Sequence, residues 1–240
     1  MRFLCLVLLV GFCYGAQIKV AAAANLSRAL QAIKVAFLKE HPKDKVLLSF
    51  GSSGSLFKQI TLGAPYDLFI SADKARPLRL VQGGYTPYPV QVYARGVLVL
   101  WSTTRKVKSL DALQDSFKHL AIANPSLAPY GRAGMEVLKK LHLADTLQLK
   151  IAEANSVGQA TSYVASKAAQ LGFSALSLMD KKAHYLIVPQ EYYSPIEQAM
   201  VLTKAGGDKA LAKDFADFIL SVKGQAILKS YGYLVPPFGS

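Results

Sequence analysis

The stretch KVLLSFGSSGS (45–55) contains the pattern that predicts the fold. Its first six residues are mostly apolar, as in a buried strand, and the glycines and serines that follow precede an amphipathic run through Leu56, Ile60 and Leu62. This order of strand, short turn and helix recurs along the chain and is typical of an α/β protein. Because ligands of open α/β sheets bind at the carboxyl ends of the strands, functional residues are expected at such junctions.

The same alternation continues on both sides of this stretch. Strands are predicted over residues 18–24, 45–50, 66–72, 96–101, 119–124, 147–154, 171–176, 185–189 and 196–204, and helices after Asn25 and Ser53, near 131–142 and 157–169, and over about 208–229. The chain is expected to cross between two mixed, mostly parallel sheets near 94–97 and to return near 197–200. This predicts two lobes with a cleft between them, residues 17–95 together with 199–240, and residues 96–198.

Asn25 and Ser53 stand at the first two junctions. In AAAANLS (21–27), small residues bring the backbone close and Asn25 occupies the expected N-cap of a helix, a role that would explain it by itself. In FGSSGS (50–55), N–H groups and hydroxyls converge at the positive end of a helix dipole, which favours an anion. This loop lacks the lysine and the spacing of a nucleotide-binding P-loop.

Two junctions in the second half of the chain offer backbone amides. In NPSLAPYGRAG (124–134), Tyr130 stands just before a helix, although a plain loop with a surface tyrosine has the same pattern. In NSVGQA (155–160), a polar residue would cap a helix and Val157 would lie in its first turn with a free N–H group. Four helix starts, two from each lobe, could thus direct donors into one cleft.

These donors favour one class of ligand. A fully deprotonated tetrahedral dianion has only acceptor oxygens, so a site made of N–H and O–H donors is complementary to it. Phosphate keeps a proton near neutral pH and can donate it to an acid, but no acid stands beside the proposed donors. Molybdate, tungstate or sulfate therefore fits the junctions better than phosphate does.

The first 16 residues, MRFLCLVLLVGFCYGA, predict export to the periplasm. They combine an early cation, an apolar run and small residues at Gly15 and Ala16, as a secretory signal peptide does, with cleavage expected near Gly15/Ala16. The bulky Phe12 before Cys13 argues against a lipoprotein anchor. Both cysteines of the chain fall in the segment to be removed, so no disulfide is expected in the mature protein.

The chain is basic, with 28 Lys and Arg against 15 Asp and Glu, and without Arg2 it keeps a net charge of about +12. Such a field suits nucleic acid, a membrane surface or a small anion drawn in by steering. Export argues against nucleic acid, and the cations are spread along the chain. The four histidines are scattered singly, so no metal held by side chains and no cofactor is expected.

Several of these segments together resemble a known family. AAAANL, FGSSGSL followed by GAPYDLFISAD (63–73), and NPSLAPYGRAG are similar to the periplasmic molybdate-binding proteins of ABC importers, and the similarity extends from about residue 18 to the YGY near the C-terminus. The resemblance implies a type II periplasmic binding fold, with two lobes that close on the ligand. It also implies a receptor that delivers molybdate or tungstate to a membrane permease. We expect it to act as a monomer and not as an enzyme.

Carried over position by position, the resemblance implies four ligand-binding residues. Asn25 stands where the family has a serine or asparagine, and Ser53 matches a serine that gives both its hydroxyl and its amide. Tyr130 and Val157 match positions that give backbone amides.

One position departs from the family pattern. Some members use a tyrosine hydroxyl in the second lobe where Ala175 stands in this chain. Either Ser174 substitutes for it, or the site follows the members that lack this contact.

Three alternatives remain open. One is a sulfate receptor. Another is a ferric iron receptor, because Tyr192 and Tyr193 resemble the paired tyrosines of a related group, although a loop-surface role explains them as well. The third is a secreted serine hydrolase, but Ser53 lies outside a G-x-S-x-G elbow and no motif places a histidine beside it. Asp67 and Asp73, at opposite ends of a strand, fit a strand start and a helix cap better than an acid–base pair.

Overall fold

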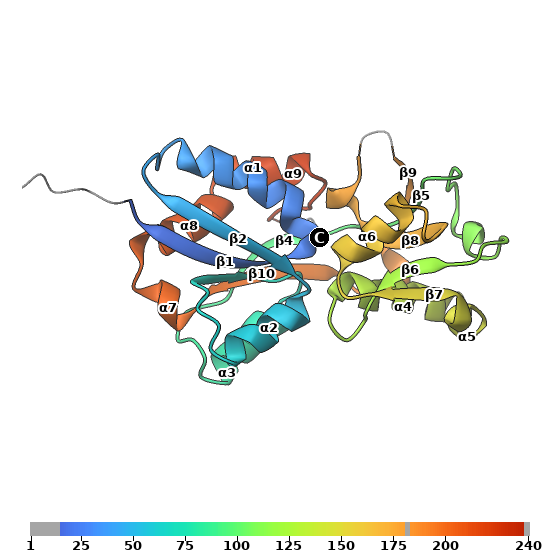
Figure 1. Ribbon diagram of the computed structural model, residues 1–240, viewed down its shortest axis with the longest axis horizontal. Helices are drawn as coiled ribbons and strands as arrows, with labels where there is room; N and C mark the ends of the chain where they lie inside the picture. Colours follow the sequence, from blue (N-terminus) through green and yellow to red (C-terminus); the bar gives the residue numbers. More distant parts are fainter. Residues whose placement is uncertain (1–14, 181–182, 238–240) are drawn as a thin grey trace, which may run out of the picture.

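The computed structural model describes residues 15–180 and 183–237. Residues 1–14 of the predicted signal peptide, which include both cysteines, lie outside the described residues. Figure 1 shows two lobes side by side, and each is built on one five-stranded sheet. Within the described ranges, no helix is long and apolar enough to cross a membrane.

The two sheets have the same arrangement of strands. The sheet of lobe 1 has the order β2-β1-β3-β10-β4, and that of lobe 2 has the order β7-β6-β8-β5-β9. In each sheet the fourth strand of this order pairs antiparallel with both neighbours, while the first three strands pair parallel with one another. The predicted α/β fold with two mixed, mostly parallel sheets is thus confirmed. The strands are β1 (Gln17–Ala23), β2 (Lys45–Gly51), β3 (Leu68–Ile70), β4 (Gln91–Gly96), β5 (Leu98–Ser102), β6 (Leu120–Ala123), β7 (Ile151–Ala154), β8 (Leu171–Ala175), β9 (His184–Ile187) and β10 (Ile196–Leu202).

The chain crosses between the lobes at two places. Only Val97 separates β4 in lobe 1 from β5 in lobe 2, and the return lies between β9 and β10. The reversed strand of each sheet is therefore the first strand after a crossing. The exact lobe boundaries stay a prediction.

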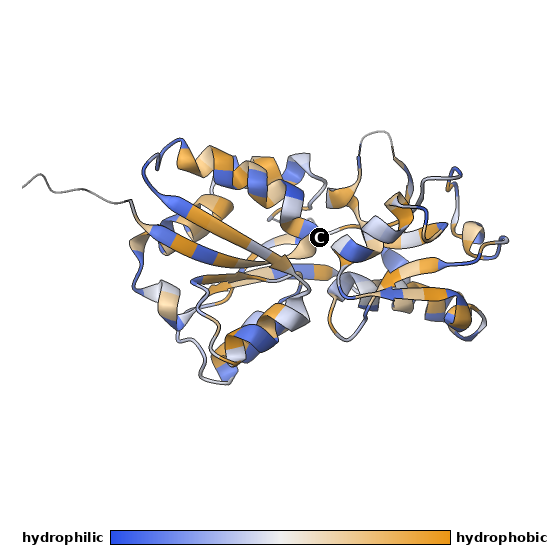
Figure 2. Ribbon diagram, viewed as in Figure 1, coloured by the Kyte–Doolittle hydropathy of each residue, from blue (hydrophilic) through white to orange (hydrophobic). Residues whose placement is uncertain are grey.

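Helices cover the sheets and bury two large apolar cores, one in each lobe, as the banding of hydropathy along the elements in Figure 2 illustrates. Most of the longer helices follow directly on a strand, so their N-termini lie near the carboxyl end of that strand. The helices are α1 (Ser27–Leu38), α2 (Ser53–Thr61), α3 (Ala75–Gln82), α4 (Pro129–Lys140), α5 (Ala144–Leu147), α6 (Val157–Ala165), α7 (Lys204–Gly207), α8 (Ala210–Leu220) and α9 (Val222–Ser230).

Two predicted elements differ from the structure. The strand expected over 147–154 begins only at Ile151, because the preceding residues form helical turns that bury Leu147 and leave Leu149 98% exposed. The helix expected over about 208–229 is two helices. Ser221 has extended backbone, and its hydroxyl accepts a hydrogen bond from the Gly224 N–H at the start of α9.

Candidate functional site

A small cavity lies between the lobes at the strand-to-helix junctions. Its volume is about 10 Å³, far below the ~300–1,000 Å³ of the pockets that hold drug-sized ligands. None of the described residues that line it is charged. They come from both lobes: Ala23, Ala24, Asn25, Gly51, Ser52, Ser53 and Ala72 from lobe 1, and Ala128, Pro129, Tyr130 and Val157 from lobe 2.

All four residues predicted for the site line this cavity. Each is almost fully buried, with an exposed fraction of 0% for Asn25, 1% for Ser53, 2% for Tyr130 and 4% for Val157. The structure thus brings together residues that lie far apart in the sequence. Their role as ligands to an anion stays a prediction.

Ser53 is the first residue of α2, and its hydroxyl is held in one orientation. Its Oγ accepts a hydrogen bond of 2.9 Å from the Ala72 N–H, two residues after the end of β3. Because that bond uses a lone pair, the hydroxyl proton is left for another acceptor. The neighbouring Ser52 caps the helix by accepting from the Ser55 N–H. Ser53 therefore offers an O–H donor at the positive end of a helix.

Tyr130 and Val157 stand in the first turns of α4 and α6, where N–H groups have no acceptor within the helix. Pro129 occupies the first position of α4, and Ser156 caps α6 through the Gln159 N–H at 3.2 Å. The side chain of Tyr130 is buried, so the alternative of a surface tyrosine is wrong. At both helix starts the backbone can donate into the cavity.

Asn25 does not cap a helix, and that part of the prediction is wrong. It lies inside a single 3-10 turn (Ala24–Leu26), and α1 begins only at Ser27 without a side-chain cap. Its amide is turned inward, where Nδ2 donates to Gln198 Oε1 at 2.9 Å and to the Tyr233 hydroxyl at 2.8 Å. No hydrogen-bond partner for its Oδ1 exists among the residues that the structure describes.

Behind the cavity, Asn25 belongs to a buried network that sequence analysis missed. Gln198 donates to the Tyr130 hydroxyl at 3.1 Å, and its Oε1 accepts from the Tyr93 hydroxyl at 2.8 Å. Burial raises the pKa of both tyrosines well above the ordinary value, so both hydroxyls keep their protons. A glutamine in the apolar strand IEQAMVL (196–202) is the one signal that could have indicated this network.

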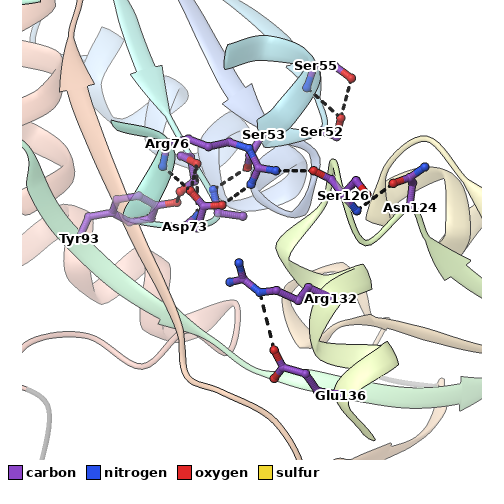
Figure 3. Close-up of polar contacts among 12 residues, drawn as sticks. Ser52, Ser53, Ser55, Asp73, Arg76, Tyr93, Asn124, Ser126, Arg132 and Glu136 are labelled. Atoms are coloured by element: carbon purple, nitrogen blue, oxygen red, sulfur yellow. Dashed lines mark hydrogen bonds and ion pairs between the residues drawn. The ribbon is translucent and has the colours of Figure 1, made fainter. Parts of the chain in front are cut away.

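The two lobes touch at the edge of the cavity, as Figure 3 shows around Arg76 and Ser126. The Arg76 guanidinium is held by an ion pair with Asp73, and it donates to the Ser126 carbonyl at 2.8 Å. The Gly54 N–H of α2 donates to the Leu127 carbonyl, also at 2.8 Å. A Cβ at Gly54 would lie 2.9 Å from the Leu127 Cα, so this approach requires glycine. The lobes are closed over the cavity.

The residues considered for a fifth contact do not line the cavity. Ala175 is fully buried in β8, and the Ser174 hydroxyl contacts that of Thr161 at 2.6 Å. Of the two alternatives for this position, the geometry of this closed structure favours a site without the tyrosine contact over a contact from Ser174.

The paired tyrosines also lie elsewhere. Tyr193 is 7% exposed, and its hydroxyl accepts from the Leu98 N–H at 3.2 Å. It is therefore buried, and the loop-surface role suggested for it by the sequence is wrong. Tyr192 packs under the Lys140 ammonium. In the described part of the chain, no three His, Cys, Asp or Glu side chains gather in a way that could hold a metal ion.

The two acids beside β3 have separate partners. Asp67 is buried, pairs with Lys209 at 2.9 Å and accepts from the Lys19 N–H. Asp73 pairs with Arg76 and accepts from its backbone N–H. Neither carboxylate lines the cavity, so the wall next to Ser53 presents no negative charge.

Comparison with known families matches residues 18–234 to the bacterial extracellular solute-binding proteins. The chain belongs to this family. This solute-binding protein is 39% identical to the molybdate-binding protein ModA of Rhodobacter capsulatus. The two match over 223 residues, which make up 91% of this chain and 88% of the relative. It is 38% identical to ModA of Azotobacter vinelandii, over 91% of this chain and 90% of the relative.

Solved structures agree with these relatives. The periplasmic molybdate-binding protein of Azotobacter vinelandii superimposes on this solute-binding protein with a TM-score of 0.87 and 41% identity, over 91% of this chain and 99% of that one. The sulfate-binding protein SubI of Mycobacterium tuberculosis gives a TM-score of 0.75 at 15% identity over 92% of this chain and 88% of that one, which shows a shared fold alone. The predicted class, a two-lobed binding protein, is confirmed.

Proposed function

We propose that this protein binds molybdate in the cavity between its lobes and delivers it to the membrane permease of an ABC transporter. The observation that carries the proposal is the composition of the cavity wall. Three helix starts and the 3-10 turn after β1 meet there, from both lobes, and no charged side chain among the described residues lines it. An oxyanion in this cavity would be held by dipoles and hydrogen bonds alone.

The proposed contacts divide between side chains and backbone. Ser53 contributes its hydroxyl, whose proton is free because Ala72 occupies a lone pair, together with its own amide. Asn25 contributes from the turn after β1, and Tyr130 and Val157 contribute N–H groups in the first turns of α4 and α6. These donors suit a ligand that has only acceptor oxygens.

The relatives support the choice of molybdate among such ligands. The Rhodobacter and Azotobacter relatives are named molybdate-binding proteins, and they match about nine-tenths of the chain. Tungstate has nearly the same shape and charge, so we include it in the proposal as a second ligand. Sulfate is smaller, and we expect the cavity to bind it less tightly.

The proposal also places the protein and its partner. The Azotobacter relative is described as periplasmic, and residues 1–16 have the composition of a signal peptide. We infer a periplasmic monomer whose lobes, residues 17–95 with 199–240 and residues 96–198, close on the anion before the permease receives it. No catalytic role is proposed.

Calorimetric titration of the mature chain with molybdate, tungstate, sulfate and ferric iron tests this function. We expect molybdate and tungstate to bind with one site per chain, and sulfate to bind at least about tenfold more weakly. Binding of sulfate alone would make the protein a sulfate receptor. Binding of ferric iron alone would move the site to other residues, and no binding of any oxyanion would contradict the proposal.

A further inference from the structure

Gln198 joins both lobes directly behind the cavity. It is fully buried on β10, where the pairing with β4 is irregular between Gln198 and Ala199. Its amide contacts Asn25 and Tyr93 of lobe 1 through one end and Tyr130 of lobe 2 through the other, at 2.9, 2.8 and 3.1 Å. It therefore touches two of the residues proposed to bind the oxyanion.

The amides of Asn25 and Gln198 must be oriented together. An amide has an N–H₂ end and an oxygen end of nearly the same shape, and a half-turn of the group exchanges them without moving its neighbours. Across the 2.9 Å contact one amide has to present N–H and the other oxygen. If one turns, the other must turn with it.

In the first arrangement, Asn25 donates to Gln198 and to Tyr233, and its oxygen is the end without a partner. The Tyr93 hydroxyl then has one proton facing two acceptors, Gln198 Oε1 and the Ser71 carbonyl at 2.9 Å. The Tyr130 hydroxyl accepts from Gln198, which leaves its own proton for another acceptor. This arrangement suits a cavity that offers a donor to the Asn25 oxygen.

In the second arrangement both amides are turned. Gln198 donates to Asn25 and Tyr93, Tyr93 donates to the Ser71 carbonyl, and Tyr130 donates to the Gln198 oxygen, all across the same distances. The Tyr233 proton then faces two oxygens of Asn25, one of which also accepts from Ser177 at 2.8 Å. The unpartnered end of Asn25 is now N–H₂.

The two arrangements satisfy similar numbers of contacts, so the group that fills the cavity decides between them. An acceptor-only anion is repelled by the first and accepts hydrogen bonds from the second. We propose that Gln198 is a positioning residue that holds the N–H₂ end of the Asn25 amide toward the bound oxyanion. This inference rests on the proposed function and explains how an asparagine in an uncharged wall distinguishes anions without protons from anions that carry one.

A double-mutant cycle tests the proposal through molybdate binding measured by calorimetry. Gln198→Met removes both polar ends at similar length. In the unaltered chain we expect it to raise the dissociation constant about tenfold, equivalent to about 1.4 kcal/mol. In an Asn25→Ala chain the same substitution has no amide to position, and we expect a change of less than about threefold.

The outcomes separate this inference from the proposed function. Equal losses in the two backgrounds would overturn the role of Gln198 while leaving molybdate binding intact. Absence of molybdate binding by the unaltered chain would overturn both. Gln225→Met is the matched control, because Gln225 is a partly buried glutamine bonded to the Ile219 carbonyl outside the cavity, and it should leave the affinity unchanged.

If Gln198→Met fails to fold, neutron diffraction of the unaltered chain with bound molybdate gives the answer directly. We expect deuterons of the Asn25 amide directed at a molybdate oxygen and the Tyr130 deuteron directed at Gln198. Deuterons of Asn25 lying between it and Gln198 would overturn the proposal.

Discussion

At the scale of single residues, the orientation of the Ser53 hydroxyl leads to a prediction. Because Ala72 donates to its Oγ, the Ser53 proton can go only to another acceptor, and the cavity is where a ligand would provide one. Replacing Ser53 by alanine removes a hydrogen bond to a charged group, worth about 1.5–3 kcal/mol. We expect Ser53→Ala to raise the dissociation constant for molybdate more than tenfold in a calorimetric titration.

The control for this substitution lies at the far end of the same helix. Thr61 also carries a hydroxyl, but it donates to the Lys58 carbonyl at the exposed end of α2. Thr61→Val should leave the affinity unchanged, and both variants should keep the far-ultraviolet circular dichroism of the unaltered chain. An unchanged affinity in Ser53→Ala would remove this hydroxyl from the site.

Residues of the candidate site could be predicted from the sequence where a short local pattern indicates their role. The turn around Ser53 was recognisable because glycines and serines follow a strand, and Val157 because a polar cap precedes it. The orientation of Asn25 was not predictable, since its partners Gln198 and Tyr233 are about 170 and 210 residues away in the sequence. A side chain that can cap a helix locally can instead form hydrogen bonds in a buried network with residues distant in the sequence.

At the scale of secondary structure, the start of α6 allows a backbone donor to be removed without loss of the helix. Val157 is the first residue of this helix, where proline is well tolerated, and Ser156 before it has the extended backbone that proline requires. We expect Val157→Pro to weaken molybdate binding about tenfold or more while the helix persists. Calorimetry and circular dichroism measure the two effects.

Val157→Ala is the matched control for this variant, because it shortens the side chain and keeps the N–H group. We expect its affinity to stay within about threefold of the unaltered chain. A large loss in the alanine variant and none in the proline variant would show that side-chain packing matters at this position and the amide does not.

Element types were largely predictable from periodicity, whereas their ends were not. The region 147–154 alternates apolar and polar residues, yet Leu149 points to solvent from a helical turn, so the alternation there did not indicate a strand. The break between α8 and α9 depends on Ser221 leaving the helical conformation. A lone serine within an amphipathic stretch carries too weak a signal to be distinguished from a continuous helix.

At the scale of the whole molecule, closure depends on the contact between α2 and the loop before α4. Gly54→Ala would place a methyl group 2.9 Å from the Leu127 backbone and hold the lobes apart. The same change favours the helix itself by up to about 1 kcal/mol, because glycine is a poor helix former. We therefore expect Gly54→Ala to weaken molybdate binding in calorimetry. The ligand-free variant should be as stable in urea as the unaltered chain, or more stable. Molybdate binding as tight as that of the unaltered chain would contradict the role of this contact in closure.

Ligand binding should also appear as a shift in thermal unfolding. At a molybdate concentration of 100 times the dissociation constant, the folded state gains about 2.7 kcal/mol. For a chain of this size each kcal/mol corresponds to roughly 2–4 °C. Differential scanning calorimetry should show a rise of roughly 5–11 °C with molybdate. An equal rise with sodium chloride at the same ionic strength would indicate a general effect of salt on this basic chain.

The two-lobed plan was predictable from the succession of strands and helices, and the meeting of four strand-to-helix junctions followed from the rule that ligands lie at strand ends. The volume of the cavity could not be predicted from the sequence, because it depends on how far the lobes close. That distance is fixed by contacts such as those of Arg76 with Ser126 and of Gly54 with Leu127, which no local pattern indicates.

The position of β10 has a consequence for the order in which the chain folds. This strand lies between β3 and β4, so the sheet of lobe 1 stays in two pieces until residues 196–202 are in place. All strands of lobe 2 lie between Leu98 and Ile187 and are complete before that point. A chain that folds progressively from its N-terminus would finish its second lobe before its first, and the ability to capture an anion would arise only in the last step of folding.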